Sequence, residues 1–351
     1  MWPAFLILTT SLKFPPEIQL IMPDYSSSDS NSADVVCAGV IVADHLCPPL
    51  SHMPHAGELV AVDRLILAIG GCAANAAINL ARLGLRTRVS GKVGPDMFGK
   101  FVVEVLEKEG LDASGMIVDP GNDTSQTLII NIANQDRRFI HTFGANRTLS
   151  VDDLRASIDD RKPPKVFYLG GYLILPGLDP AELAEFFAWL GSLGVHRVLD
   201  VATPGPGDYL PQLRPVLPHV DAFLPNEDEA ALILGPGTPL EHARAFQKMG
   251  TKLAVITCGG HGAIVASRNE CIELGVYDVP FVDGTGGGDA FDAGYIAGVV
   301  EGGDIQSCLT RAAAQGASCV QGIGTTATIF NKAKSDEFIR QNPLSLRIIQ
   351  E

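Results

Sequence analysis

A glycine-rich turn between two acidic residues is the stretch of this sequence best suited to chemistry. It runs Val282-Asp283-Gly284-Thr285-Gly286-Gly287-Gly288-Asp289-Ala290-Phe291, after the apolar run 277–282 and before a helical pattern of small and apolar residues. Glycines let successive backbone N–H groups point into one concavity, and a helix N-terminus adds about half a positive charge there. The pattern predicts a strand, a phosphate-binding turn and a helix.

An acidic residue beside an anion site repels phosphate, so Asp289 requires its own explanation. Its carboxylate could take the proton from an attacking hydroxyl during phosphoryl transfer, which is kinase chemistry. Asp is also a common helix N-cap, and a glycine turn before a helix is often only a tight connection. On these residues alone both interpretations stay open.

Three further motifs offer polar groups to a ligand. Gly70-Gly71-Cys72-Ala73-Ala74-Asn75 is a second glycine turn that opens a helix, where Asn75 could hold hydroxyl groups or simply cap and pack. The spacing in Asn226-Glu227-Asp228-Glu229 favours a capping box over a site for phosphates and hydrated Mg²⁺. Thr257-Cys258-Gly259-Gly260-His261-Gly262 reads either as a hairpin turn or as a nucleotide-binding loop.

Other catalytic patterns are excluded. Residues 94–100 match the start of a P-loop, but Phe101 stands where a hydroxyl must bind Mg²⁺, and no GxGxxG follows the first strand. The eight histidines show no metal-ligand spacing, which predicts no zinc site. The seven cysteines contain no CxxC pair, which indicates a reducing compartment.

Composition is that of a soluble globular protein. Of 351 residues, 46% are apolar and 19% charged, and the net charge of −14 argues against nucleic acid or an anionic membrane as a partner. Residues 1–34 contain the polar run Ser26–Ser32 and no basic signal-peptide region, so we expect a disordered leader. No stretch suits a membrane helix, and the expected location is the cytoplasm.

From residue 35 onward, strands and helices alternate. Strands are expected at 35–42, 86–90, 165–169, 196–200, 220–224 and 252–257, and helices at 73–83, 97–109, 183–193, 227–234 and 240–249. The alternation indicates an α/β fold with a mainly parallel sheet covered on both faces. Such sheets bind ligands at the carboxyl ends of their strands, where Asp44, Asn226, Gly259 and Asp283 fall.

Two segments interrupt the alternation. Residues 58–69 and 127–142 read as strand pairs without helices, and the second pair turns at Asn134-Gln135-Asp136. Both would emerge from the same end of the sheet. An excursion of strands over a site typically forms a lid or an oligomer contact.

Taken together, these stretches resemble the ribokinase-like (PfkB) family of carbohydrate kinases. Gly70-Gly71-x-Ala-Ala-Asn75-x-Ala77, followed by Gly84 and Gly94, is similar to the first family signature, and 282–291 to the second, usually written DTxGAGDxF. Asn226-x-x-Glu229 resembles its NxxE motif, and Gly94-x-Asp96-x-Phe98-Gly99 its G-x-D-x-F-G. The resemblance implies a three-layer sandwich over 35–345, with a β-sheet lid from about 56–69 and 126–143 that often also dimerises.

The resemblance also implies transfer of the γ-phosphoryl group of ATP to a hydroxyl of a sugar or sugar acid. Asp289 would be the general base, and the amides of Gly286, Gly287 and Gly288 the anion hole. Sugar hydroxyls would be held by Asp44, Gly71 and Asn75. The nucleotide would contact Asn226, Thr257, Gly259, Gly262 and the helix around 311–319. Glu229 would act on Mg²⁺ through water, and Asp283, with the turn 322–324, would border a K⁺ site.

Departures from the family pattern keep alternatives open. Gly284 replaces the usual Thr or Ser and Gly287 the usual Ala, which makes the loop more flexible. Ribokinase proper carries a Lys where this chain has Cys72 and an acidic sugar contact after the strand that here ends Leu169-Gly170-Gly171, and both differences argue against true ribokinase activity. The rivals are a nucleoside kinase, with Phe139 and Phe143 on a lid face, and a catalytically silent sugar- or nucleotide-binding protein. Three polar lid residues, Arg137, Arg138 and His141, could meet an anionic sugar or be solvated strand-edge charges.

Overall fold

The structure is a computed structural model that describes residues 33–349 apart from 134, 136 and 137. The leader expected over 1–34 therefore lies outside the described residues except for its last two. Within the described part of the chain, no helix is long and apolar enough to cross a membrane.

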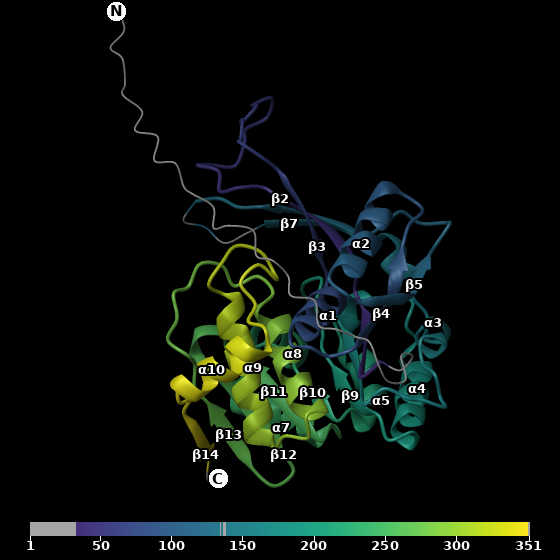
Figure 1. Cartoon of the computed structure of the whole chain (residues 1–351), viewed down its shortest axis with the longest axis vertical. Coiled ribbons are helices and arrows are strands. Elements are labelled where there is room, and N and C mark those ends of the chain that lie inside the picture. The colour runs from purple at the N-terminus through teal and green to yellow at the C-terminus, as the bar shows by residue number, and fades with distance from the viewer. Residues whose placement is uncertain (1–32, 134, 136–137, 350–351) are drawn as a thin grey trace, which may run out of the picture. The chain divides into compact units, whose positions relative to one another are not determined.

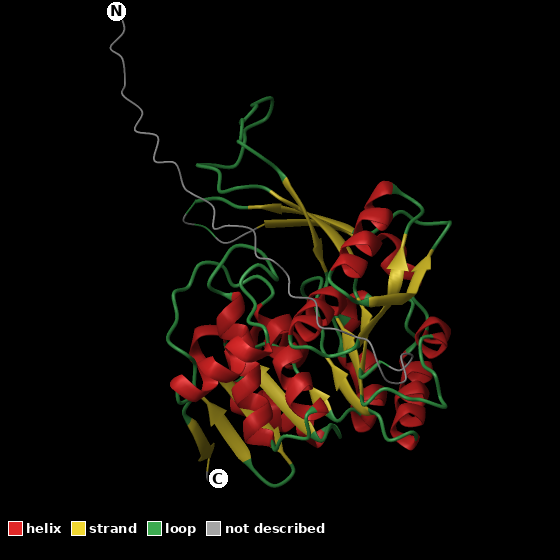
Figure 2. Cartoon of the chain, in the orientation of Figure 1, coloured by secondary structure: helices red, strands yellow, loops and turns green. Residues whose placement is uncertain are grey.

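Two sheets organise the described chain (Figure 1, Figure 2). The ten-stranded sheet has the order β14 (Leu346–Ile349), β13 (Cys271–Leu274), β12 (Ala263–Ser267), β11 (Leu253–Thr257), β10 (Ala222–Phe223), β9 (His196–Leu199), β8 (Val166–Gly170), β1 (Val35–Gly39), β4 (Thr87–Val93) and β5 (Asp112–Val118). Strands β11 to β5 in this order are parallel, whereas β12, β13 and β14 add an antiparallel edge. The expected α/β fold with a mainly parallel sheet is confirmed.

Helices cover both faces of the large sheet and make it the middle of three layers. On β1, Val35 and Cys37 pack with α1, α2, α8 and α9, while Val36 and Ala38 pack with α3, α4, α5, α6 and α7. The helices are α1 (Cys72–Arg82), α2 (Met97–Lys108), α3 (Val151–Ala156), α4 (Pro180–Ser192), α5 (Leu210–Val216), α6 (Glu227–Leu234), α7 (Pro239–Lys248), α8 (Gly287–Val300), α9 (Ile305–Cys319) and α10 (Lys332–Gln341). Because strand residues alternate between faces, both helical layers bury apolar side chains.

The smaller sheet, which we call the lid, has the order β3 (Ile66–Gly70), β2 (Val42–Leu46), β6 (Gln126–Ile130) and β7 (Arg138–Thr142). The β2–β3 and β6–β7 pairs are antiparallel, and β2–β6 is parallel. The strand pair predicted at 127–142 is confirmed as β6 and β7, although most of the predicted turn at 134–136 lies outside the described residues.

Three strand predictions are wrong in part. The apolar run 35–42 divides at Val40 and Ile41 into β1 and β2, which belong to different sheets. Residues 58–65 form no strand, so β3 pairs with β2 instead of with a neighbour inside 58–69. The run 277–282 is also irregular, because its apolar side chains pack on α9 and α10 or line a cavity rather than extending the sheet.

Candidate active site

Two helices that begin at glycines point their N-termini into the same region. Helix α8 starts after Gly286 and helix α1 after Gly71, and neither has a side-chain cap, whereas α2, α3, α4, α6, α7, α9 and α10 all do. Uncapped N-terminal amides need acceptors from elsewhere, which a bound anion can supply. Gly286 has φ 78° and Gly71 φ 93°, so both turns require glycine.

A hydrogen bond joins the two helix starts across 214 residues of sequence. The Nδ2 of Asn75 on α1 donates to Oδ2 of Asp289 on α8 at 2.8 Å. The Oδ1 of the same amide is buried and has no hydrogen-bond partner among the described residues. A buried acceptor left without a donor is costly, so this atom is suited to receive a ligand hydroxyl.

Burial raises the pKa of Asp289, although hydrogen bonds from Asn75 and from the thiol of Cys72 oppose the rise. A carboxylate in such a place is more basic than one in water, as a general base requires. The prediction that Asp289 acts as a base is therefore consistent with its surroundings, and its role remains a prediction.

A cavity of about 550 Å³ lies beside the start of α8. It is lined by all four predicted nucleotide-binding residues and by small residues of α9: Asn226, Thr257, Gly259, Gly262, Ala313, Gly316 and Ala317. The loop 258–262 turns β11 into β12 and also faces the cavity, so it is both hairpin turn and cavity wall. The volume suits a ligand of nucleotide size.

The glycines at the base of this cavity differ in why they must be glycine. A Cβ on Gly286 would lie 2.8 Å from Cβ of Thr325, whereas a Cβ on Gly288 would meet nothing within 4 Å. Gly287 and Gly288 both line the cavity, so the packing gives no reason for glycine at 288, and a closely approaching ligand does. Of the three predicted anion-hole amides, that of Gly287 already donates to O of Gly284 at 3.2 Å.

The Asn226–Glu229 motif forms the capping box that its spacing favours. Oδ1 of Asn226 accepts from N of Glu229 at 2.9 Å, and Oε2 of Glu229 accepts from N of Asn226 at 3.0 Å. The box leaves Oε1 of Glu229 and Nδ2 of Asn226 outside it. Burial, together with the charge of Asp289, raises the pKa of Glu229 to about 7. Capping and ligand binding are thus compatible here.

The predicted sugar contact Asp44 lies within lid strand β2 rather than at the end of a strand of the large sheet. It is buried, and a Cβ on Gly70 would lie 1.9 Å from its Oδ2, so the glycine makes room for the carboxylate. Burial and the charge of Asp289 raise the pKa of Asp44 to about 6, against a hydrogen bond from Thr127. The lid therefore places the carboxylate of Asp44 close enough to that of Asp289 for their charges to interact.

Asp283 contacts the turn 322–324, as expected for the two parts of one site. Its Oδ1 accepts from N and Oγ1 of Thr285 at 3.0 and 2.7 Å, and its Oδ2 accepts from N of Gly324 at 3.2 Å. It is not a cavity-lining residue, so its K⁺ role stays a prediction.

Four functional candidates escaped the sequence analysis. Tyr168 donates through its hydroxyl to Oδ2 of Asp292 at 3.1 Å and of Asp200 at 3.4 Å, and all three are buried. Cys72 joins them, because its Sγ and carboxylate oxygens of Asp200 and Asp289 lie within 4.8 Å of one another. Asp200 could have been found at the end of its strand, and Asp292 by its i+3 spacing from Asp289.

Comparison with known proteins then identifies the family. The family described as pfkB family carbohydrate kinase matches residues 32–332. The chain belongs to this family of carbohydrate kinases. It is an enzyme of the phosphotransferase class, and the resemblance drawn from its motifs is confirmed.

Individual pfkB relatives differ in their named substrates. The chain is 27% identical to a 2-dehydro-3-deoxygluconokinase of Bacillus subtilis (81% of this chain, 90% of the relative) and 26% identical to a nucleoside kinase of Methanothermobacter thermautotrophicus (86% and 93%). Among solved structures, Arabidopsis thaliana ribokinase complexed with ribose and ATP superposes with a TM-score of 0.75 at 23% identity, over 88% of this chain and 99% of that one. At that identity the match shows the ribokinase-like fold alone.

Proposed function

We propose that this protein transfers the γ-phosphoryl group of ATP to a hydroxyl of a sugar or sugar acid, with Asp289 as general base. The contact between Asn75 and Asp289 carries the proposal, since it puts a buried carboxylate and an orphan acceptor at the meeting point of two uncapped helix starts. Gly287 and Gly288, at the start of α8, also line the nucleotide-sized cavity.

The chemistry follows from these positions. Asp44, Gly71 and Asn75 would bind the sugar so that one hydroxyl faces Asp289. The carboxylate takes the proton as the hydroxyl oxygen attacks the γ-phosphorus, the bond to the β-phosphate oxygen breaks, and ADP leaves. Free amides at the start of α8, among those of Gly286–Gly288, would stabilise the charge on the transferred group.

Nucleotide and metal would occupy the cavity side. Asn226, Thr257, Gly259 and Gly262 would contact ATP, whose base would lie on the small residues of α9. The donor set fits Mg²⁺, because the carboxylates of Glu229 and Asp200 interact and supply the oxygen ligands that this ion prefers. When bound, Mg²⁺ neutralises phosphate charge, and Glu229 would hold it through water.

The acceptor side favours hydroxyl-rich substrates. Asp44 and Oδ1 of Asn75 are acceptors, which suit neutral hydroxyl groups. Of the polar lid residues that could meet an anion, Arg137 lies outside the described residues, Arg138 is exposed and donates to Oε1 of Gln135 at 2.6 Å, and His141 lies 2.9 Å from Oγ1 of Thr127. These contacts support a neutral sugar ahead of a sugar acid.

Two features support further parts of the proposal. The contact of Asp283 with the turn 322–324 supports a monovalent-cation site such as K⁺. Leu128 and Ile140 face each other across β6 and β7 and are 38% and 61% exposed, which supports a homodimer formed through the lid. We also propose a cytoplasmic location, a leader over 1–34 and a kinase domain over 35–345.

Coupled ADP release against a panel of sugars, sugar acids and nucleosides, with Mg²⁺ and with or without K⁺, tests the proposal. We expect turnover with a sugar. Turnover confined to nucleosides would replace the proposal with nucleoside kinase activity, and ATP binding without turnover on any acceptor would favour the silent binding protein. Light scattering at two protein concentrations tests the dimer.

A further inference from the structure

The connection between lid strands β2 and β3 carries a cluster of metal-ligating side chains that share no residue with the candidate active site. It spans residues 47–65 and forms the long loop that extends from the lid sheet (Figure 1, Figure 2). Within it, His52, His55 and Glu58 are three residues apart in succession. The expectation that no two histidines have ligand spacing is therefore wrong.

The start of the loop is fixed to the lid. Leu50 is buried and bridges to Ile132, its N–H donating to O of Asn131 at 2.9 Å while its own carbonyl accepts from N of Ala133 at 2.8 Å. Pro48, Pro49 and Pro54 further restrict the backbone of this limb. The histidines are thus carried by a segment that begins at a defined place, despite its exposure.

A tight turn brings two of the ligating residues together. The N–H of Glu58 donates to O of His55 at 3.0 Å, and Gly57 between them has φ 79°, which is the pattern of a type II turn with glycine at its third position. The Oε2 of Glu58 then accepts from the N–H of His55 at 2.8 Å. The carboxylate is consequently held over the turn rather than extended into solvent.

His52 completes the cluster and is itself oriented. Its Nε2 lies 2.9 Å from Oε1 of Glu58, and its Nδ1 lies 2.9 Å from Oγ of Ser51. Its ring centroid is 5.7 Å from that of His55. A second partner on the ring nitrogen that faces away from the metal is typical of metal-ligating histidines, because it fixes the tautomer and the ring plane.

Ligand atoms of the three side chains lie within 4.8 Å of one another. Zn–N and Zn–O bonds are about 2.0–2.2 Å long, so small rotations of exposed side chains bring all three onto one ion. Two imidazoles and one carboxylate form a donor set that suits Zn²⁺ and its neighbours Co²⁺, Ni²⁺ and Cu²⁺, whereas Mg²⁺ prefers oxygen ligands alone. We propose that His52, His55 and Glu58 bind one transition-metal ion of the Zn²⁺ class, with water in the fourth position.

An ion pair alone does not account for this arrangement. An exposed histidine–glutamate pair contributes little to stability and gives no reason for a second imidazole beside the same carboxylate. A bound ion would instead join the two limbs of the loop and slow its local opening, since a ligand that binds only the closed form stabilises it.

Titration of the full-length protein without a histidine tag, after removal of metal by chelation, tests the proposal. Co²⁺ serves as the probe, read by its visible absorption, and Zn²⁺ as the competitor, read by calorimetry. We expect one equivalent to bind, and His52→Ala, His55→Ala and Glu58→Gln each to weaken binding at least about tenfold. His219→Ala is the matched control and should bind as the wild type does. His52, His55 and Glu58 are exposed, so their substitution should leave folding unaffected.

Limited proteolysis supplies a second measurement. Leu59 is 86% exposed, and chymotrypsin should cleave after it several-fold more slowly with Zn²⁺ in the wild type but not in His55→Ala. A wild type that binds no equivalent of Co²⁺ overturns the proposal. So does wild-type affinity in a His52→Ala/His55→Ala double variant, which would assign the ion to the group of Cys72, Asp200 and Asp289, with a thiolate absorption band as its signature.

Discussion

Carboxylates in two regions of this protein have opposite environments. In the candidate active site, Asp44, Asp200, Glu229, Asp289 and Asp292 all have raised pKa values, for which burial is the largest cause, and none forms an ion pair with Lys or Arg among the described residues. Beside the β4–β5 end of the sheet, Asp119 and Asp153 flank Lys92, and their pKa values are lowered. The same residue type therefore serves two purposes.

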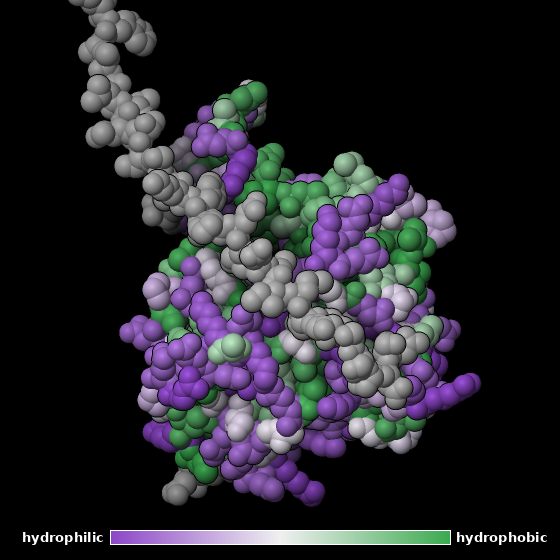
Figure 3. Space-filling model, in the orientation of Figure 1, coloured by the Kyte–Doolittle hydropathy of each residue, from purple (hydrophilic) through white to green (hydrophobic). Residues whose placement is uncertain are grey.

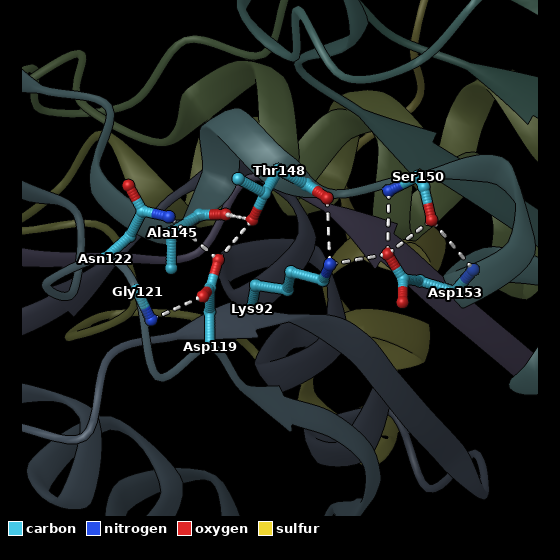
Figure 4. A network of polar contacts seen from close by, with 8 residues as sticks. All are labelled: Lys92, Asp119, Gly121, Asn122, Ala145, Thr148, Ser150 and Asp153. Carbon is cyan, nitrogen blue, oxygen red and sulfur yellow. Dashed lines mark hydrogen bonds and ion pairs between the residues drawn. The ribbon is translucent and has the colours of Figure 1, made fainter.

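The paired region shows how carboxylates are stabilised in this fold (Figure 4). Nζ of Lys92 lies 2.7 Å from Oδ2 of Asp153 and donates to O of Thr148 at 2.8 Å. Burial raises the pKa of Asp153, but hydrogen bonds from Lys92 and Ser150 outweigh it. The Thr148 hydroxyl and the N–H of Gly121 hold the pKa of Asp119 low.

The site omits such partners, and the omission is informative. Buried carboxylates without cations destabilise a fold, so their retention at one place points to a function that needs unpaired acceptors. Substrate hydroxyls and Mg²⁺ would supply the missing donors and charge only when bound. The face of the molecule drawn in Figure 3 mixes hydrophilic and hydrophobic residues.

The largest expected effect is on activity, and it should distinguish the carboxylates of the candidate active site from those paired with Lys92. Asp289→Asn should reduce kcat by about 10³-fold, since general bases contribute about 10²–10⁴, and should not lower the melting temperature. Asp153→Asn is the matched control: it should keep kcat and lower the melting temperature. Coupled ADP release and calorimetry measure both. Near wild-type turnover in Asp289→Asn would show that the base has been assigned to the wrong residue.

The next effect concerns stability at another paired carboxylate, Asp221, which lies outside both regions and forms ion pairs with Arg197 and Lys252. Burial raises the pKa of Asp221, but Arg197 and Lys252 bring it down to about 2, so its contribution is present above the unfolded pKa of about 3.8 and is lost as pH falls towards 2. Asp221→Asn should lower the unfolding free energy at pH 7 by about 2 kcal/mol. Denaturant titration measures the change.

Asp292→Asn should have the opposite sign. Burial raises the pKa of Asp292, and the charge of Asp289 adds to the rise, so the folded state favours the protonated form and stability is lost as pH increases through the folded pKa. The neutral amide should therefore raise the melting temperature at pH 8 and much less at pH 5. A decrease at pH 8 would mean that the carboxylate is stabilised by its neighbours rather than strained.

Glycine 288 extends the comparison to the amide side of the site. Because a Cβ there meets nothing in the protein, Gly288→Ala should stabilise α8 by about 0.5–1 kcal/mol, yet it should weaken ATP use about tenfold by entering the cavity. Denaturant titration measures the gain in stability, and the KM for ATP measures the loss of nucleotide binding. An unchanged KM for ATP would show that the phosphates do not bind at this turn.

The sequence predicted best those parts of the fold that depend on interactions between residues close in sequence. Helix α6 has the predicted bounds because the capping box at Asn226 and Gly235 after Leu234 define its ends. The run 277–282 misled because an apolar segment that lines a cavity has the same pattern as a buried strand. The sequence could not predict that Asp200 and Asp292 lie together, because they are joined by hydrogen bonds from Tyr168, which belongs to a third element, β8.

The smallest predicted effect concerns the thiol of Cys72, which lies beside Asp289. The thiol of Cys72 donates to Asp289 and so favours its charged form, while burial raises the pKa of the thiol itself and keeps it protonated at neutral pH. Cys72→Ala removes this donor, so the pKa of Asp289 should rise. The base must be ionised, and the acid side of the profile of kcat against pH should move to higher pH by less than about one unit, because S–H donors are weak. Cys72→Ser keeps a donor and should restore the wild-type profile. A shift to lower pH would contradict this, because it would mean that the sulfur of Cys72 is a thiolate whose negative charge raises the pKa of Asp289.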